Sequence, residues 1–320
     1  MIRSGFIGGI AAVGVGAMQA RATPVRIGYL GNVCEAATYA APAADAFARE
    51  GLEASIVRFA SEAALVDALA GGRVDAASMR LASLLAPLAR GSRIRVLAGL
   101  HSGCLRVVSP DPVAARFTDL RGKTVAIDYL RSPSMNMLSA LLGVRGIDPR
   151  EVSWRVFGSD ALAQQLIAKN VSCVAAADPL GYLLLTSQLA APYLDTADGG
   201  FTCGTDFAHG HHCFLTMHAG LVEKRGTTAA AITRAFLATS RAMPKRIGVE
   251  AVRDAQAGYA DDDVSQTIGM LSSYRWNASA EFVAEEIEFT ARDFVGVGLL
   301  PKGTNPHDLA GRAYANVLNV

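Results

Sequence analysis

A short segment near residue 210 gathers most of the side chains in this sequence that could bind a metal or react. Residues 208–220 read AHGHHCFLTMHAG and include four histidines and a cysteine, although the whole chain of 320 residues has only six histidines and five cysteines. Imidazole nitrogens and thiol sulfurs bind soft and borderline metals, two thiols can form a disulfide, and both side chains also pack in ordinary cores. The chemistry of this segment therefore depends on the elements that position it.

Three interpretations of this His/Cys segment stay open. In the first, its side chains alternate along a strand, and the cysteine packs as a small apolar residue. In the second, Cys213 forms a disulfide with Cys104 or with Cys203, which an oxidising compartment permits. In the third, the segment binds a soft metal or a metal-containing ligand, although the spacing matches no standard zinc motif. The candidate metal ligands are His101, Cys104, His211, His212 and Cys213.

Short β-rich runs alternate with helical segments from residue 25 onward. A helix is predicted over Ala36–Glu50, and a second helix begins after the capping residue Ser61 and ends before Gly71. Strands that alternate with helices predict a parallel, doubly wound sheet, so the fold class is α/β. The predicted strands of this first series are Val25–Leu30, Ala54–Phe59, Val74–Met79 and Ile94–Leu100.

The alternation breaks after Leu100, because only His-Ser-Gly separates that strand from the next apolar run, Cys104–Pro110. A second β/α series follows, in which Ser132 caps a helix with Pro133 in its first turn. The chain then returns through His212–Gly220, which has strand character. These two crossings predict two domains, the first formed by residues 23–102 and 216–320 and the second by residues 103–215.

The first 22 residues have the pattern of a secretory signal peptide. An uncharged apolar run, Gly5–Met18, follows one positive charge, and Ala20–Ala22 reads ARA, a small-x-small cleavage pattern. The apolar run is shorter than the ~20 residues of a membrane-spanning helix, so we expect cleavage after Ala22 and export. Cleavage removes two arginines and no acidic residue, which changes the formal net charge from +1 to −1. A nearly neutral chain offers no field that attracts nucleic acid.

Several phrases of the sequence resemble a known family of transport proteins. The phrases are VRIGYL, AFAREGLEASIVRFASEAALVDALAGGRVDAASM, LARGSRIRVLAGL, DLRGKTVAID and DALAQQLIAKNVSCVAAADP, within residues 25–185. In them the chain is similar to the periplasmic substrate-binding proteins of ABC importers of the nitrate/sulfonate/taurine/bicarbonate group. That group shares its fold with proteins that bind or synthesise the pyrimidine precursor of thiamine. The resemblance implies a type II periplasmic binding protein, with two lobes that are each a doubly wound sheet and two hinge crossings.

The resemblance also implies a binding protein and no enzyme. We expect a periplasmic monomer without a cofactor that captures a small anionic ligand between its lobes and delivers it to an ABC permease in the membrane. The sequence holds no G-x-S-x-G, H-E-x-x-H or P-loop motif, which agrees with that expectation. The alternative is an enzyme similar to the pyrimidine-precursor synthases, which use cysteine, histidine and iron. The run HGHHCF keeps that alternative open.

Polar residues that follow the predicted strands are the candidate ligand contacts, because open α/β sheets bind ligands beyond the carboxyl ends of their strands. Ser132 and Ser134 begin a helix, whose N-terminus attracts anions. Arg80 and Arg131 could hold an oxyanion, and Asp178 either binds a donor group or caps the next helix. The candidate ligand-binding residues are Asn32, Cys34, Glu35, Arg80, Cys104, Arg131, Ser132, Ser134, Asp178, His212 and Cys213.

The resemblance connects this ligand site with the His/Cys segment. In the resembled fold the two crossings run side by side, which would bring His101 and Cys104 close to residues 211–213. We therefore expect these thiols and imidazoles to lie together at the floor of the cleft.

Overall fold

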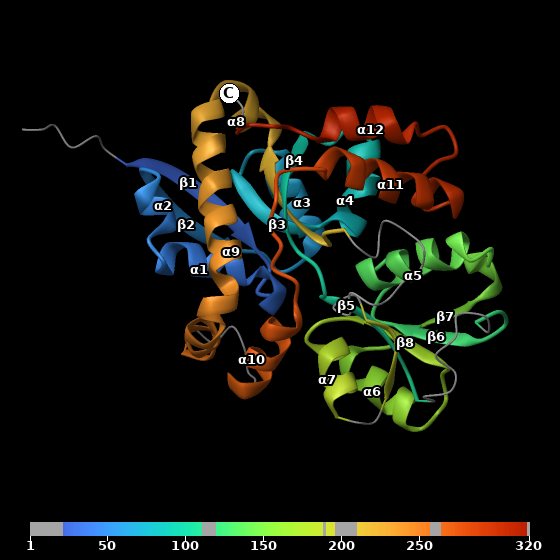
Figure 1. The fold of residues 1–320 in the computed structure, drawn as a ribbon. Coiled ribbons are helices and arrows are strands. Elements are labelled where there is room, and N and C mark those ends of the chain that lie inside the picture. Colours follow the sequence, from blue (N-terminus) through green and yellow to red (C-terminus); the bar gives the residue numbers. More distant parts are fainter. Residues whose placement is uncertain (1–21, 111–119, 188–189, 196–209, 257–263, 319–320) are drawn as a thin grey trace, which may run out of the picture.

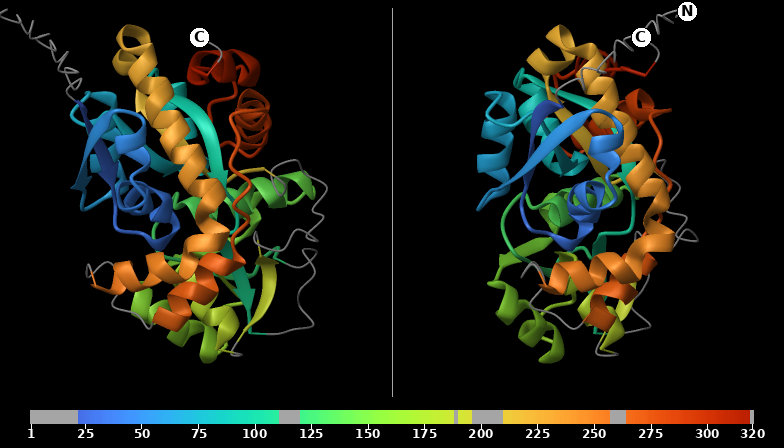
Figure 2. Two further views of the ribbon diagram at one scale, coloured as in Figure 1. Left: turned by 60° about the vertical axis from the view of Figure 1, so that its left-hand side comes forward. Right: turned by 90° about the vertical axis from the view of Figure 1, so that its left-hand side faces the viewer.

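The computed structural model describes residues 22–110, 120–187, 190–195, 210–256 and 264–318. These residues form two α/β lobes, each built on its own five-stranded sheet (Figures 1 and 2). The predicted two-lobed α/β fold is confirmed. Residues 1–21 of the predicted signal peptide, together with Cys203 and His209, lie outside the described residues.

The first sheet has the strand order β2-β1-β3-β10-β4. Its strands are β1 (Thr23–Tyr29), β2 (Leu52–Arg58), β3 (Ala76–Arg80), β4 (Ile94–His101) and β10 (Cys213–His218). β1 runs parallel to β2 and β3, as expected for strands joined by helices, whereas β10 is antiparallel to both β3 and β4. All residues of β3 are buried, because the sheet is covered on both faces and its central strands face apolar side chains on each side.

The second sheet has the strand order β7-β6-β8-β5-β9. Its strands are β5 (Leu105–Ser109), β6 (Thr124–Ile127), β7 (Ser153–Val156), β8 (Cys173–Ala177) and β9 (Ala191–Asp195). β6 is parallel to β7 and β8, while β5, the strand by which the chain enters this lobe, is antiparallel to β8 and β9. In each sheet, one strand next to a crossing, β10 or β5, is therefore antiparallel to its neighbours.

Helices cover the sheets of both lobes (Figure 1). Those around the first sheet are α1 (Ala36–Ala43), α2 (Ala46–Arg49), α3 (Glu62–Ala70), α4 (Leu81–Ala89), α8 (Ala219–Lys224), α9 (Gly226–Gln256), α11 (Val283–Gly296) and α12 (Pro306–Ala313). The second lobe has α5 (Pro133–Val144), α6 (Ser159–Ile167) and α7 (Leu180–Thr186), and α10 (Val264–Ser273) lies between α9 and α7. Two short 3-10 helices, η1 (Val33–Glu35) and η3 (Pro149–Glu151), precede α1 and β7. Within the described ranges, no helix is both long enough and apolar enough to cross a membrane.

The single helix predicted over residues 36–50 is wrong in one respect, because the chain forms α1 and α2 instead. Pro42 lies in the last turn of α1 and has no N–H group for that turn. Asp45 then adopts a left-handed backbone with φ of 52°, which short polar side chains tolerate. These two residues end α1 before α2 begins.

Strand β9 was not among the elements predicted from the sequence. It holds Pro192 and lies at the edge of the second sheet. Proline cannot donate to a strand ladder and is tolerated at a sheet edge. A proline is compatible with this strand, because β9 pairs with a neighbour on one side only.

The two crossings between the lobes lie side by side, as predicted. The His212 backbone N–H donates to the His101 carbonyl over 3.0 Å, and Cys213 is paired in register with His101. A further segment runs beside the first crossing, because Ser102 pairs with Arg275 and Gly99 with Ser279. The hinge region therefore contains three neighbouring segments where two were expected.

The predicted boundary at residue 215 differs from the position of β10. Residues 213–215 were placed in the second domain, but they pair with β3 and β4 of the first sheet. Phe214 and Leu215 are fully buried there, so burial of their apolar side chains favours the earlier start of the strand.

A buried ion pair ties the second sheet to α10. The Arg106 guanidinium on β5 donates to Asp178 Oδ1 over 2.9 Å and to Ser273 Oγ of α10 over 2.7 Å. Both charged side chains are almost fully buried. Removing one partner of such a pair leaves an uncompensated buried charge.

Arg106→Ala is therefore expected to lower the free energy of unfolding by about 3–5 kcal/mol. Urea unfolding followed by circular dichroism measures the loss. The control is Arg292→Ala, which removes an exposed pair with Glu288 and should cost less than about 1 kcal/mol. Equal losses in the two variants would contradict a stabilising role for the buried pair.

Candidate functional site

A cavity of about 390 Å³ lies between the lobes at the carboxyl ends of the strands. This is where open α/β sheets place their ligands. Its apolar walls come from both lobes and include Leu30, Leu162 and Leu180. Its polar lining consists of Asn32, Ser61, Glu62 and Arg80 from the first lobe and Asp128, Tyr129, Ser159 and Asp178 from the second.

Arg80 is the positive charge in the lining of this cavity. It is the last residue of β3 and only 8% exposed. One guanidinium nitrogen, Nη2, lies 3.4 Å from Cys34 Sγ, while Nε has no hydrogen-bond partner among the described residues. A buried donor without a partner is costly, and this donor belongs to a residue of the cavity lining.

Two side chains meet across the opening of the cavity. The Tyr129 hydroxyl, from the loop after β6, donates to Glu62 Oε2 at the start of α3 over 3.3 Å. Burial raises the pKa of Tyr129 well above its usual value, so the phenol stays protonated and remains a hydrogen-bond donor to Glu62. Glu62 and Asp128 provide carboxylate acceptors at the same cavity, and the lining therefore carries both signs of charge.

The two serines predicted as an anion pair do not line the cavity. Ser132 is fully buried, and its hydroxyl accepts from the Met135 backbone N–H over 3.3 Å as the N-cap of α5. Ser134 is also buried, and Pro133 is the residue of this helix start that faces the cavity. The helix-capping alternative for Ser132 is confirmed.

Arg131 lies outside the cavity between the lobes. It has a left-handed backbone with φ of 63° and an exposed side chain. It lines a neighbouring groove of about 690 Å³ together with Arg90 and Asn136. The structure therefore separates the two arginines that were predicted to act on the same anion.

Asp178 reaches the cavity, but both of its carboxylate oxygens are bonded within the protein. They accept from Arg106, and Oδ1 also accepts from the Tyr182 backbone N–H in the first turn of α7 over 2.8 Å. The capping alternative for this residue is confirmed.

Glu35 orients the loop that follows β1. Its carboxylate accepts from the backbone N–H groups of Leu30, over 3.1 Å, and Asn32, over 2.9 Å. Burial raises the pKa of this carboxyl to about 8, although the backbone donors favour its charged form. Glu35 holds Asn32 at the edge of the cavity but does not line the cavity itself.

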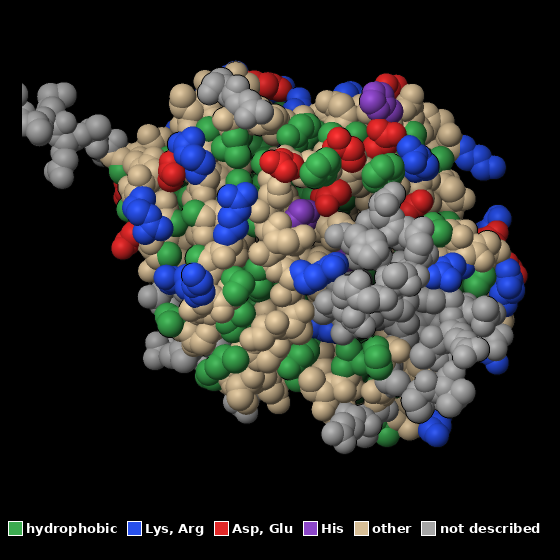
Figure 3. Space-filling model, viewed as in Figure 1, with side chains coloured by type: hydrophobic (Ala, Val, Ile, Leu, Met, Phe, Trp, Pro, Cys, Tyr) green, Lys and Arg blue, Asp and Glu red, His purple; other side chains and the backbone are tan. Residues whose placement is uncertain are grey.

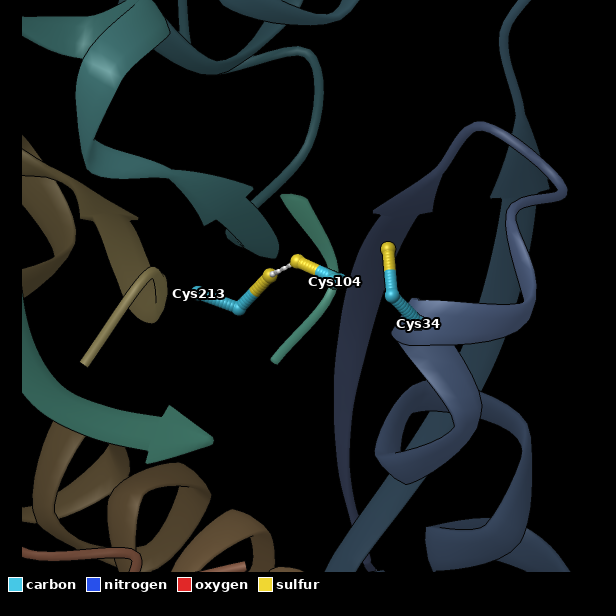
Figure 4. A group of neighbouring side chains, drawn as sticks. All are labelled: Cys34, Cys104 and Cys213. Carbon is cyan, nitrogen blue, oxygen red and sulfur yellow. Dashed lines mark hydrogen bonds between the residues drawn. The ribbon is translucent and has the colours of Figure 1, made fainter. Parts of the chain in front are cut away.

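Three of the predicted cysteines form a thiol triad, which we define as Cys34, Cys104 and Cys213. Their sulfurs all lie within 4.8 Å of one another, and those of Cys104 and Cys213 are 3.6 Å apart, hydrogen-bonded but not joined by a disulfide. Figure 4 shows that Cys104 and Cys213 point toward each other and that Cys34 approaches from η1. Hydrogen bonds from the other two thiols lower the pKa of Cys104 well below its usual range, and the contact with Cys104 raises that of Cys213.

The imidazoles near the triad are bonded to other groups. His101 Nε2 donates to the Cys34 carbonyl over 2.7 Å, and burial lowers the pKa of this ring, which keeps it neutral. His212 Nδ1 accepts from the Gly103 backbone N–H over 3.4 Å. His211 contacts Glu286 and the Asn277 carbonyl, and Glu286 outweighs burial and raises the pKa of that ring. Of the five predicted metal ligands, only Cys104 and Cys213 belong to a group of possible donors, and Cys34 completes it.

Several residues that line the cavity were not among the predicted ligand-binding residues. Ser61 and Glu62 follow β2, Asp128 follows β6, and Ser159 follows β7, so each lies just beyond the carboxyl end of a strand. The rule that selected Arg80 applies equally to these residues. Arg106 gave no such signal, because it lies inside an apolar strand.

The chain is similar to known proteins in sequence and in fold. The model of the NMT1-like family matches residues 18–253, whereas no curated protein matches the chain. The alkanesulfonate-binding protein SsuA from Xanthomonas axonopodis, solved with bound MOPS, has a TM-score of 0.71 and 19% identity over 93% of this chain and 99% of its own.

Two further solved structures have similar scores. The periplasmic aliphatic sulphonate-binding protein SsuA from Escherichia coli has a TM-score of 0.72 and 18% identity, over 92% of each chain. The periplasmic nitrate-binding protein NrtA from Synechocystis has a TM-score of 0.72 and 13% identity, over 93% of this chain and 87% of its own. These likenesses establish the fold of a periplasmic binding protein.

Ser132→Ala tests the capping role at the edge of the cavity. Loss of the hydroxyl leaves an N–H of the first turn of α5 unpaired, so the free energy of unfolding should fall by about 0.5–2 kcal/mol. The control is Ser159→Ala, because Ser159 is an exposed first residue of α6 and makes no cap bond. Equal stability of the two variants in urea unfolding would refute the cap.

Proposed function

The chain belongs to the NMT1-like family, and from that premise we propose that it is an exported solute-binding protein. It captures a small anionic ligand in the cavity between its lobes and delivers that ligand to an ABC permease. Capture involves no chemical change of the ligand. The observation that carries the proposal is the buried guanidinium of Arg80, whose Nε lacks a partner at the edge of that cavity.

The ligand is proposed to have two unlike ends. Its oxyanion accepts from Arg80, since a charge-assisted bond to a buried guanidinium is stronger than a neutral one. Its other end donates to the carboxylates of Glu62 and Asp128, which share the lining with Arg80. Two of the structural relatives are named for sulfonates and one for nitrate, and all of these ligands are small anions.

Ligand entry requires the lobes to separate. Arg80 is nearly inaccessible in this structure, and the bond between Tyr129 and Glu62 joins the second lobe to the first. Hinge closure around a ligand is a common motion of two-lobed clamps, and a ligand that contacts both lobes favours the closed state. We propose that residues 23–102 and 213–320 move as one unit and residues 105–212 as the other.

We also propose that the protein does not bind nucleic acid, and the charges on the face drawn in Figure 3 support this. Figure 3 shows basic side chains scattered among acidic and apolar ones on this face, without a single basic patch. Together with the near-neutral charge of the chain, this distribution offers no field that attracts a polyanion. We further propose that the exported protein is a monomer in the periplasm.

Arg80→Ala is expected to weaken binding of an anionic ligand about 10- to 150-fold, the equivalent of the about 1.5–3 kcal/mol of a hydrogen bond to a charged group. A thermal-shift screen of sulfonates, nitrate, carboxylates and other oxyanions would identify the ligand, because saturation at a hundredfold excess over Kd adds about 2.7 kcal/mol of stability. Calorimetry would then measure the affinities of the variants.

The control for that variant is Arg131→Ala, which removes an arginine from the neighbouring groove and should leave the affinity unchanged. Arg80→Lys should bind with intermediate affinity, since it keeps the charge without the fork of donors. If Arg80→Ala binds the identified ligand as tightly as the unmodified protein does, the proposed binding mode is wrong.

Export predicts a mature chain that begins at Thr23. Small residues at Ala20 and Ala22 fit the signal peptidase pattern. Mass spectrometry of protein recovered from the periplasm measures the N-terminus, and Ala22→Arg should abolish this cleavage. Recovery of the chain with Met1 intact in the cytoplasm would contradict export.

A further inference from the structure

The thiol triad joins three segments that are far apart in the sequence. Cys34 belongs to η1, Cys104 lies in the first crossing, and Cys213 begins β10 after the second. Each of the three side chains is at most 2% exposed. None of them lines the cavity between the lobes, so the triad is a feature separate from the proposed solute site.

The spacing of the sulfurs fits a site with one central ion. Metal–sulfur bonds of ~2.3 Å place the sulfurs of a planar three-coordinate site about 4 Å apart. The 3.6 Å between the Cys104 and Cys213 sulfurs and the 4.8 Å limit on all three separations are compatible with that value. A disulfide between Cys104 and Cys213 would use two of the sulfurs and leave Cys34 outside.

The number and type of donors select the ion. Thiolates are soft ligands that favour Cu(I), zinc and iron–sulfur clusters, and structural zinc requires four ligands. In the described part of the chain the triad is the only group of three or more potential metal ligands, and it offers three sulfurs. We propose that Cys34, Cys104 and Cys213 form a buried three-sulfur site for a soft monovalent cation, Cu(I).

Arg80 compensates the charge of the occupied site. Cu(I) bound by two thiolates and one thiol forms a unit of net charge −1, and its formation releases two thiol protons to solvent. The Arg80 guanidinium, 3.4 Å from Cys34 Sγ, supplies the opposite charge. A buried unit whose charge is balanced avoids most of the penalty for removing charge from water.

The test uses the mature full-length protein, reduced and kept under anaerobic conditions. It is titrated against the coloured complex of Cu(I) with bicinchoninate, and loss of colour measures transfer of Cu(I) to the protein. The expected result is one Cu(I) per chain with sulfur-only, three-coordinate geometry in X-ray absorption. No transfer, or nitrogen ligands in the absorption spectrum, would overturn the proposal.

Substitutions of single cysteines test whether the thiol triad is the Cu(I) site. Cys34→Ser should lower the Cu(I) affinity by more than about 100-fold, because even residues that only support metal ligands account for about 10- to 100-fold. Cys173→Ser, at a buried cysteine of the second sheet, and Cys203→Ser should leave it unchanged. Thermal unfolding of the copper-free variants verifies that each is folded.

Two results with these variants would count against the site. One is an unchanged Cu(I) affinity in folded Cys34→Ser, and the other is a Cys104–Cys213 disulfide in the exported protein as isolated. Measuring the anion affinity of Cys34→Ser separately distinguishes failure of the copper site from failure of the solute-binding function.

Discussion

The insertion of β10 between β3 and β4 is the constraint on which the rest of the structure depends. One strand completes the first sheet and also ends the return from the second lobe. Cys213 at its start pairs in register with Arg80 on β3 and with His101 on β4. The Thr216 hydroxyl, which donates to the Ala77 carbonyl over 2.8 Å, fixes that register from inside the core. Because a shift by one residue would exchange the two faces of the strand, the cavity, the crossings and the thiol triad all depend on this pairing.

Arg80 links the two proposed sites through a single side chain. A buried guanidinium requires partners on every side where it is shielded from water. Its Nη2 contacts the sulfur of Cys34, and its buried Nε has no hydrogen-bond partner among the described residues. Neither of these two groups is hydrogen-bonded to a protein carboxylate, although the Glu62 carboxylate lines the same cavity. The position of this residue at the end of a fully buried strand therefore accounts for both its cost to stability and its capacity to bind.

The sequence predicted the fold well because alternating strands and helices leave few ways to pack two sheets. It also placed the caps at Ser61 and Ser132, which depend on local bonds. It could not show that Arg106 pairs with Asp178 or that Cys34 meets two cysteines from distant segments, because those contacts exist only after the sheets have formed. Arg80 could be found from its place at a strand end, whereas the histidines drew attention by number alone. The break between α1 and α2 and strand β9 were missed, because a left-handed residue and tertiary strand pairing determined those outcomes.

The histidines cluster near the hinge for a reason that differs from metal binding. Where a strand leaves one sheet for another, backbone groups lose their ladder partners and still require hydrogen bonds. An imidazole can donate with one nitrogen and accept with the other, and His101 donates to the Cys34 carbonyl while His212 accepts from Gly103 N–H. Gly99 leaves room for His211, since a Cβ there would lie 2.2 Å from that ring. Thiols are too weak as hydrogen-bonding groups for this task, so the imidazoles satisfy the backbone and the sulfurs are left facing one another.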